Sequence, residues 1–65
     1  MLLLVAPSLV FANEQILTPK QWYEKGMEFY NNKDYRNAIS AYSMAIKADP
    51  EYLNAYARRA HAYRI

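Results

Sequence analysis

The sequence has no cysteine and only one histidine and one glycine among its 65 residues. Without cysteine, the chain cannot form a disulfide framework or a thiolate metal site. A single histidine, His61, cannot form a Cys–His catalytic pair or a zinc site from this chain alone. A single glycine, Gly26, is too few for a glycine-rich phosphate loop. We therefore expect no catalytic residues, no metal, no cofactor and no small-molecule substrate.

The balance of charge and apolar residues favours a small ordered domain. The net charge is +2, which is too small to indicate a polyanion partner by itself. Hydrophobic residues make up 54% of the chain and seven residues are tyrosine, a composition typical of ordered chains. A chain of 65 residues is one small domain at most, and such domains bury little surface.

Residues 1–12 form an apolar run without a charged side chain, followed by the polar residues 13–15. The run is too short to cross a bilayer, which takes about 20 residues. It is typical of a signal peptide, although no Lys or Arg precedes Lys20. The alternative is an apolar N-terminal helix packed on the rest of the chain, which would have to accommodate Pro7.

The signal-peptide interpretation predicts export to the periplasm or outside the cell, with residues 13–18 as a linker. Contact with the membrane would then be transient and limited to the signal segment. Under the alternative, the chain is cytoplasmic.

Apolar and small residues between positions 22 and 50 follow the spacing of two packed helices. Trp22, Gly26 and Phe29 recur at i, i+4 and i+7, and Ala38 and Tyr42 begin a second stripe after a polar break. Glycine costs a helix roughly 1 kcal/mol relative to alanine, so Gly26 indicates a close approach of another helix.

Helix start and stop signals divide this part of the chain into three helices. The first is expected over residues 19–32, where Thr18 and Gln21 can form a capping box around Pro19. Asp34 is expected to cap a second helix that ends near residue 48, before Pro50. The third covers residues 52–65. We expect the first two helices to pack antiparallel, with the third roughly parallel to the first.

The first helix is repeated 34 positions later. Its stripe residues Trp22, Gly26 and Phe29 are matched by Tyr56, Ala60 and Tyr63. A helix–turn–helix period of this length is the signature of a solenoid, in which no unit buries its apolar face alone.

The chain resembles the tetratricopeptide repeat family over residues 19–65. The residues that carry the resemblance are Trp22, Gly26, Phe29, Ala38, Tyr42 and Pro50. It implies an all-α helix-turn-helix repeat at residues 19–52, followed by the first helix of a second, incomplete repeat at 53–65. The sequence departs from the family pattern at Lys25, where a leucine is usual, and at Lys33, where a turn glycine is expected. We expect Asn32 to supply the left-handed turn conformation.

The resemblance and the stripes together predict which residues pack the repeats. The predicted packing core is Trp22, Gly26, Phe29, Ala38, Tyr42, Ala45, Pro50, Tyr56, Ala60 and Tyr63.

A second stripe on the first helix lies beside the packing one. In this family the first helix of each repeat lines a concave groove that binds peptides, so the resemblance implies a groove formed by Tyr23, Met27, Tyr30, Asn54, Arg58, His61 and Arg64. The alternative is that Tyr23, Met27 and Tyr30 are core between repeats, as aromatic and Met stripes usually are. Family members that grip a terminal carboxylate carry Lys, Asn and Asn where this chain has Tyr23, Met27 and Arg58, so that clamp is not expected.

These features favour a non-catalytic scaffold that binds a protein or peptide partner. The alternatives are a basic surface for anions or nucleic acid on the third helix, or a part of a larger enzyme of the same family. The basic surface would use Arg58, Arg59, His61 and Arg64, which are more simply explained as a solvated helix face. The third helix is also expected to leave an uncovered face through which the chain could self-associate.

Overall fold

The computed structural model describes residues 16–65, which form three helices, α2 (Pro19–Asn31), α3 (Tyr35–Ala48) and α4 (Leu53–Arg64). The predicted signal peptide and half of the predicted linker, residues 13–15, lie outside the described residues. No strand occurs between residues 16 and 65. The predicted all-α fold is confirmed, and each helix begins and ends within one residue of its expected bounds.

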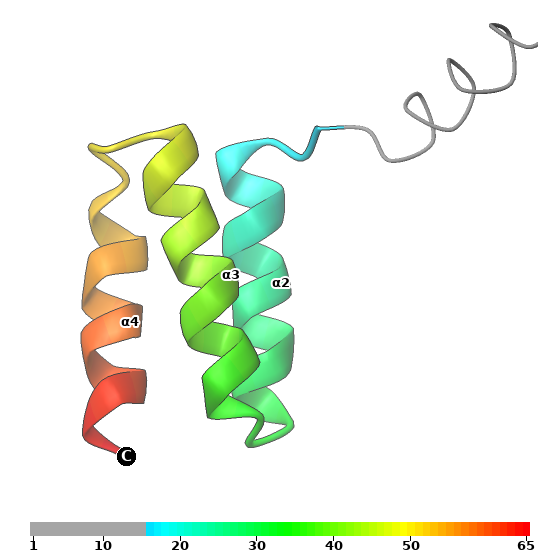
Figure 1. Ribbon diagram of the computed structural model, residues 1–65, viewed down its shortest axis with the longest axis vertical. Helices are drawn as coiled ribbons and strands as arrows, with labels where there is room; N and C mark the ends of the chain where they lie inside the picture. Colours follow the sequence, from blue (N-terminus) through cyan, green and yellow to red (C-terminus); the bar gives the residue numbers. More distant parts are fainter. Residues whose placement is uncertain (1–15) are drawn as a thin grey trace, which may run out of the picture.

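The helices follow one another as a helix-turn-helix pair and a third helix. Along the chain α2 and α3 run in opposite directions, and α4 lies beside α3 and runs parallel to α2 (Figure 1). The predicted arrangement is therefore confirmed. None of these three helices is long and apolar enough to cross a membrane.

The N-terminus of α2 is fixed by the predicted capping box. The backbone N–H of Gln21 donates to Thr18 Oγ1 at 3.1 Å, and the backbone N–H of Thr18 donates to Gln21 Oε1 at 2.8 Å. Pro19 occupies the first turn, where its missing N–H leaves no bond unmade. The sequence signal thus sets where the helix begins.

The turn between α2 and α3 corrects one expectation. Lys33 has a φ of 62°, whereas Asn32 has a φ of −91°. The left-handed residue is therefore Lys33, at the position where the family pattern has glycine, and not Asn32. The backbone N–H of Asp34 then donates to the Phe29 carbonyl at 2.9 Å, and Asp34 Oδ1 accepts from the Asn37 N–H at 3.4 Å to cap α3.

The core lies between α2 and α3, around one aromatic ring. Ala38, Tyr42 and Ala45 of α3 are fully buried, and Trp22 and Phe29 of α2 pack against them while remaining partly exposed. Gly26 is buried directly against the Tyr42 ring, where a Cβ would stand 2.5 Å from Cε1. The close approach predicted from the single glycine is present.

α4 packs on α3 through a face that the sequence did not indicate. Its buried residues are Ala55 and Ala62, and Arg59 between them donates from Nη1 to the Ser43 hydroxyl at 3.0 Å. Both alanines were absent from the predicted core.

The predicted core residues of α4 are not buried within residues 16–65. Tyr56, Ala60 and Tyr63 are exposed, because they lie on a face of α4 that does not contact α3. Pro50 is also exposed, and its carbonyl accepts a hydrogen bond from the Tyr56 hydroxyl at 3.0 Å. Among residues 16–65 these four residues are therefore not buried.

Candidate functional site

The second stripe of α2 lies where α2 and α4 meet. Tyr23, Met27 and Tyr30 are half-buried and pack against the core, while Arg58 and His61 of α4 are exposed beside them. We call these five residues the α2–α4 face. The structure brings together five of the seven residues predicted for the groove, and the other two, Asn54 and Arg64, are exposed on α4.

Tyr30 links the two helices of this face. Its hydroxyl is hydrogen-bonded to His61 Nδ1 at 2.5 Å, and the two rings lie 5.5 Å apart between centroids. The edge of the Tyr35 ring packs against Tyr30 at a centroid distance of 5.3 Å. The side chain therefore packs against both neighbouring helices while its polar end reaches the surface, as is typical of tyrosine.

Tyr23 has the same dual character at the other end of the face. It stacks on Tyr52 with 5.3 Å between ring centroids and lies tilted against Tyr42 at 5.8 Å. Hydrogen bonding to the Tyr23 side chain raises the pKa of the exposed Arg58 guanidinium. Tyr23 and Tyr30 therefore both pack against the core and are both partly exposed.

Beneath the face lies the hydroxyl of Tyr42. The Tyr42 side chain is fully buried, and its hydroxyl oxygen has no hydrogen-bond partner among residues 16–65. Burial raises the pKa of Tyr42, and the positive charge of Arg58 lowers it in part. Tyr42 was predicted as core from its spacing, but a spacing pattern gives no sign that its hydroxyl would be left without a partner.

Arg58 and Arg59 of α4 have different neighbours. Arg59 is directed to Ser43 of α3 and its guanidinium lies over the Tyr56 ring, 5.7 Å from the ring centroid. Arg58 instead lies beside Tyr23 of α2. Two consecutive arginines on a helix are about 100° apart around its axis, so their side chains lie beside different neighbouring residues.

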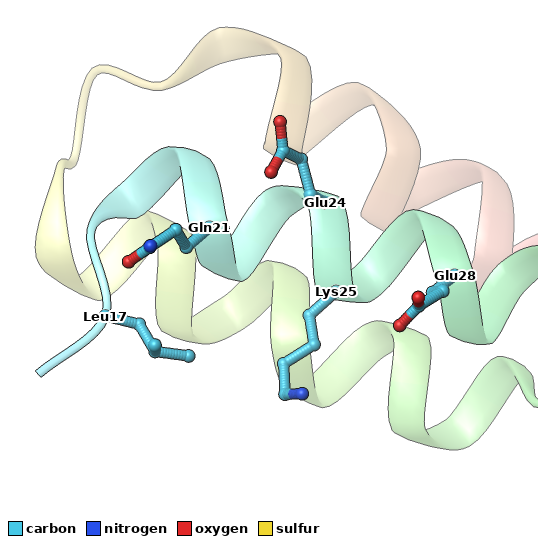
Figure 2. A pocket seen from close by; sticks show the side chains of 5 residues that line it. All are labelled: Leu17, Gln21, Glu24, Lys25 and Glu28. Carbon is cyan, nitrogen blue, oxygen red and sulfur yellow. The ribbon is translucent and has the colours of Figure 1, made fainter. Parts of the chain in front are cut away.

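A shallow hollow lies on the other side of α2, and sequence reasoning did not predict it. Its volume is about 250 Å³, and Figure 2 shows its lining side chains, which are Leu17, Gln21, Glu24, Lys25 and Glu28. Positions 21 and 23, or 25 and 27, are two residues apart and so about 200° apart around the helix. The hollow is therefore separate from the α2–α4 face.

The 34-residue period relates the hollow side of α2 to the side of α4 that packs on α3. Subtracting the 34-residue period from the positions at which α4 packs on α3, 55, 59 and 62, gives 21, 25 and 28. These positions carry Gln21, Lys25 and Glu28 on α2, and all three are exposed. This side therefore carries two buried alanines and the partly buried Arg59 on α4, but three exposed polar residues on α2.

Between residues 16 and 65 no three side chains of the types His, Cys, Asp and Glu come together as a group that could hold a metal ion. The exposed carboxylates Glu24 and Glu28 line the hollow, and Asp34 caps α3.

Comparison with known proteins gives one match. A family model described as tetratricopeptide repeat matches residues 19–52, which cover α2, the turn and α3. No match was found among curated proteins or among solved structures.

Proposed function

Because the chain belongs to the tetratricopeptide repeat family, we propose that it is a non-catalytic scaffold that binds a peptide segment of a partner protein on the α2–α4 face. Repeats of this family are generally protein–protein interaction modules. The partner is a protein, and no small-molecule substrate is involved.

The observation that carries the proposal is the mixed character of the α2–α4 face. Tyr23, Met27 and Tyr30 present half-buried apolar surface, to which the two tyrosines add hydroxyl groups, while Arg58 and His61 add exposed polar groups. Half-buried tyrosines offer contact area at low conformational cost, and methionine adapts to differently shaped partners. Such a surface suits a peptide with an aromatic or aliphatic anchor.

The experiment is to select peptides against the full chain from a displayed library and to map the best binder by NMR. We expect amide shifts to change around Tyr23, Met27 and Tyr30 on α2 and around Arg58 and His61 on α4. Tyr30→Ala should weaken every selected peptide, with melting curves used to check that the variant is folded.

Lys25→Ala is the matched control, because Lys25 is on the same helix but lines the hollow on the other side. It should bind peptides like the parent. The ligand surface would lie elsewhere if the amide shifts changed only at Gln21, Lys25 and Glu28. The same would follow if a folded Tyr30→Ala variant bound peptides like the parent.

We further propose that the chain is exported and that residues 1–12 are its signal peptide. The support is the apolar, uncharged run that ends before the polar residues 13–15. Mass spectrometry of the exported protein should find Asn13 as the first residue. Recovery of the full 65-residue chain from the cytoplasm would contradict export.

A further inference from the structure

One side of α4 carries an apolar stripe that is exposed in the described part of the chain. Its residues follow one another at intervals of three, four and three positions, the spacing of a helix that packs along another helix. They are Leu53, Tyr56, Ala60 and Tyr63, all four exposed, and we call them the α4 stripe. Arg58 is two residues from Tyr56 and from Ala60, and so about 200° away around the helix. The α4 stripe is therefore separate from the α2–α4 face.

Tyr56 is held in place within the α4 stripe. Its hydroxyl donates to the Pro50 carbonyl at 3.0 Å, and the Arg59 guanidinium lies over its ring, 5.7 Å from the centroid. Arg59 is itself held by the hydrogen bond to Ser43. A side chain that is already ordered loses little freedom when a partner binds. The α4 stripe is therefore preformed for binding at its centre.

Helix α2 carries the equivalent stripe, and there it is in use. Subtracting the 34-residue period from positions 56, 60 and 63 gives Trp22, Gly26 and Phe29. Gly26 is buried, and the two aromatic residues pack against the core residues of α3. Helix α3 runs antiparallel to α2 along this stripe (Figure 1). By analogy, the α4 stripe suits the apolar side of another antiparallel helix.

The charges of α4 decide what kind of helix this is. Arg59 and Arg64 lie on opposite sides of the α4 stripe, three residues after Tyr56 and four after Ala60. The helix contains no Asp or Glu, and the nearest acidic residue before it is Glu51. Two copies of α4 packed together would bring like charges side by side, which disfavours a second copy. Acidic residues beside the apolar side of the incoming helix would instead complement both arginines.

We propose that the α4 stripe binds an amphipathic helix of a partner protein, antiparallel to α4, with acidic residues beside its apolar side. This is a second interaction surface, and it does not depend on peptide binding at the α2–α4 face.

Ala60 sets a further requirement on this partner. At the equivalent position of α2, a Cβ on Gly26 would stand 2.5 Å from Tyr42 Cε1. Ala60 has such a Cβ, so a helix packed in the same way cannot present tyrosine opposite it without overpacking. The partner therefore has a shorter residue at this point, such as leucine.

The test measures binding of helical probes to the full 65-residue chain by fluorescence anisotropy. Each probe is a dye-labelled, end-blocked copy of residues 34–49, which are α3 and its two caps, because α3 is the helix that binds the equivalent stripe. The first probe has glutamate at the exposed positions 37, 44 and 47 and leucine at position 42. The second differs from the first only in keeping tyrosine at position 42. The third differs from the first only in having glutamine in place of the three glutamates.

We expect the parent to bind the first probe about tenfold more tightly than the second, because tyrosine overpacks against Ala60. It should bind the first probe about threefold more tightly than the third, because exposed charge pairs add only modestly to affinity. Ala60→Gly should remove the preference for leucine, and Tyr63→Ala should weaken the first probe by about tenfold. Met44→Ala is the control, because it removes an exposed apolar side chain from α3, and it should bind like the parent.

Melting curves show whether each variant is folded, and the comparison of probes on the parent tests the fit even if Ala60→Gly does not fold. Docking on α4 is wrong if no probe binds the parent, or if Met44→Ala weakens the first probe as much as Tyr63→Ala does. It is also wrong if the second probe binds more tightly than the first, because the probe then replaces α3 on α2.

The remaining outcomes test the fit, the charge and the occupant separately. If the first two probes bind the parent equally, or if a folded Ala60→Gly variant keeps the preference for leucine, the packing opposite Ala60 is wrong. Equal binding of the first and third probes would contradict an acidic partner. Sedimentation of the chain without probe tests for a second copy. A dimer that Tyr63→Ala dissociates would show that a second copy covers the α4 stripe, and the proposed partner would be wrong.

Discussion

Gly26 and Tyr42 make the closest contact between α2 and α3, and this contact limits what position 26 can carry. A Cβ there would stand 2.5 Å from Tyr42 Cε1 and 2.6 Å from Cδ1. The Tyr42 ring is fully buried, so it has little room to withdraw. Gly26→Ala gains up to about 1 kcal/mol in helix propensity but overpacks the core at a cost of about 1–3 kcal/mol.

With the full gain in helix propensity, we therefore expect Gly26→Ala to lower the free energy of unfolding by up to about 2 kcal/mol. Urea denaturation followed by Trp22 fluorescence measures it, since this is the single tryptophan of the chain. Lys25→Ala is the control at the neighbouring exposed position, where a surface substitution changes stability by no more than about 0.5 kcal/mol. A Gly26→Ala variant more stable than the parent would show that the two helices adjust freely.

Tyr42 should be replaceable by phenylalanine without loss of stability. The substitution keeps the ring and removes a buried hydroxyl that has no hydrogen-bond partner in the described part of the chain, residues 16–65. An unpaired buried polar group costs about 1–3 kcal/mol, so we expect Tyr42→Phe to unfold at the same or a higher urea concentration at neutral pH. A clear loss of stability would show that the hydroxyl is hydrogen-bonded in solution.

The raised pKa of Tyr42 gives this residue a pH signature. Burial favours the neutral phenol in the folded state, whereas the unfolded chain ionises near the ordinary value of 10.0. The unfolded state then binds fewer protons above that pH, so the stability of the parent should fall as pH rises past 10.0. Tyr42→Phe should show a smaller fall. Tyr63→Phe, at a position 66% exposed, should keep the parent's dependence.

The bounds of the helices could be predicted because their signals are local. Thr18, Pro19 and Asp34 each act within one turn of their own position, so spacing alone shows where α2 and α3 begin. The Tyr30–His61 hydrogen bond joins residues 31 positions apart and depends on two rotamers and on how α4 packs. The stripes place both residues on one side of the repeat, but no local signal specifies the bond.

The packing face of α4 was missed for a similar reason. The 34-residue period equates Tyr56 with Trp22, which packs on the second helix of its own repeat. Helix α4 meets α3, the second helix of the preceding repeat, and uses Ala55 and Ala62 instead. A pair of alanines seven residues apart is a weak signal among the other alanines of this helix.

The turn between α2 and α3 stores strain at one residue. Lys33 has a φ of 62°, a conformation that costs a non-glycine residue about 1 kcal/mol or more. We expect Lys33→Gly to raise the free energy of unfolding by up to about 1 kcal/mol. Glycine removes the conformational strain at this position, and this gain exceeds the free-energy cost of the more flexible unfolded chain.

Asn32→Gly is the matched control for this turn. Asn32 has a φ of −91°, so glycine relieves no backbone strain there. It only raises the entropy of the unfolded chain, which lowers the free energy of unfolding by about 0.5–1 kcal/mol. Thermal melts followed by circular dichroism should therefore shift in opposite directions for the two variants. Equal shifts would mean that Lys33 is not the strained residue.

The three helices form a row in which α3 is covered on two sides and α4 on one. The main contacts are between α2 and α3 and between α3 and α4. The uncovered side of α4 carries exposed apolar side chains, with Leu53 at 74%, Tyr63 at 66% and Tyr56 at 39% exposure. Each helix of such a row depends on its neighbours for burial, and ordering each residue costs about 1–2 kcal/mol. We therefore expect residues 16–65 to be only marginally stable.

The last prediction is that a further helix on α4 stabilises the whole row. By the 34-residue period, Tyr56, Ala60 and Tyr63 occupy the positions of the α2 residues that pack on α3. A helix joined after Ile65, with an apolar stripe, a small residue facing Ala60 and a polar outer side, should therefore raise the melting temperature and sharpen the transition. A helix of equal length that is polar all round is the control and should have little effect. If both extensions melt like the parent, the exposed face of α4 is not a packing face, and the marginal-stability argument is wrong.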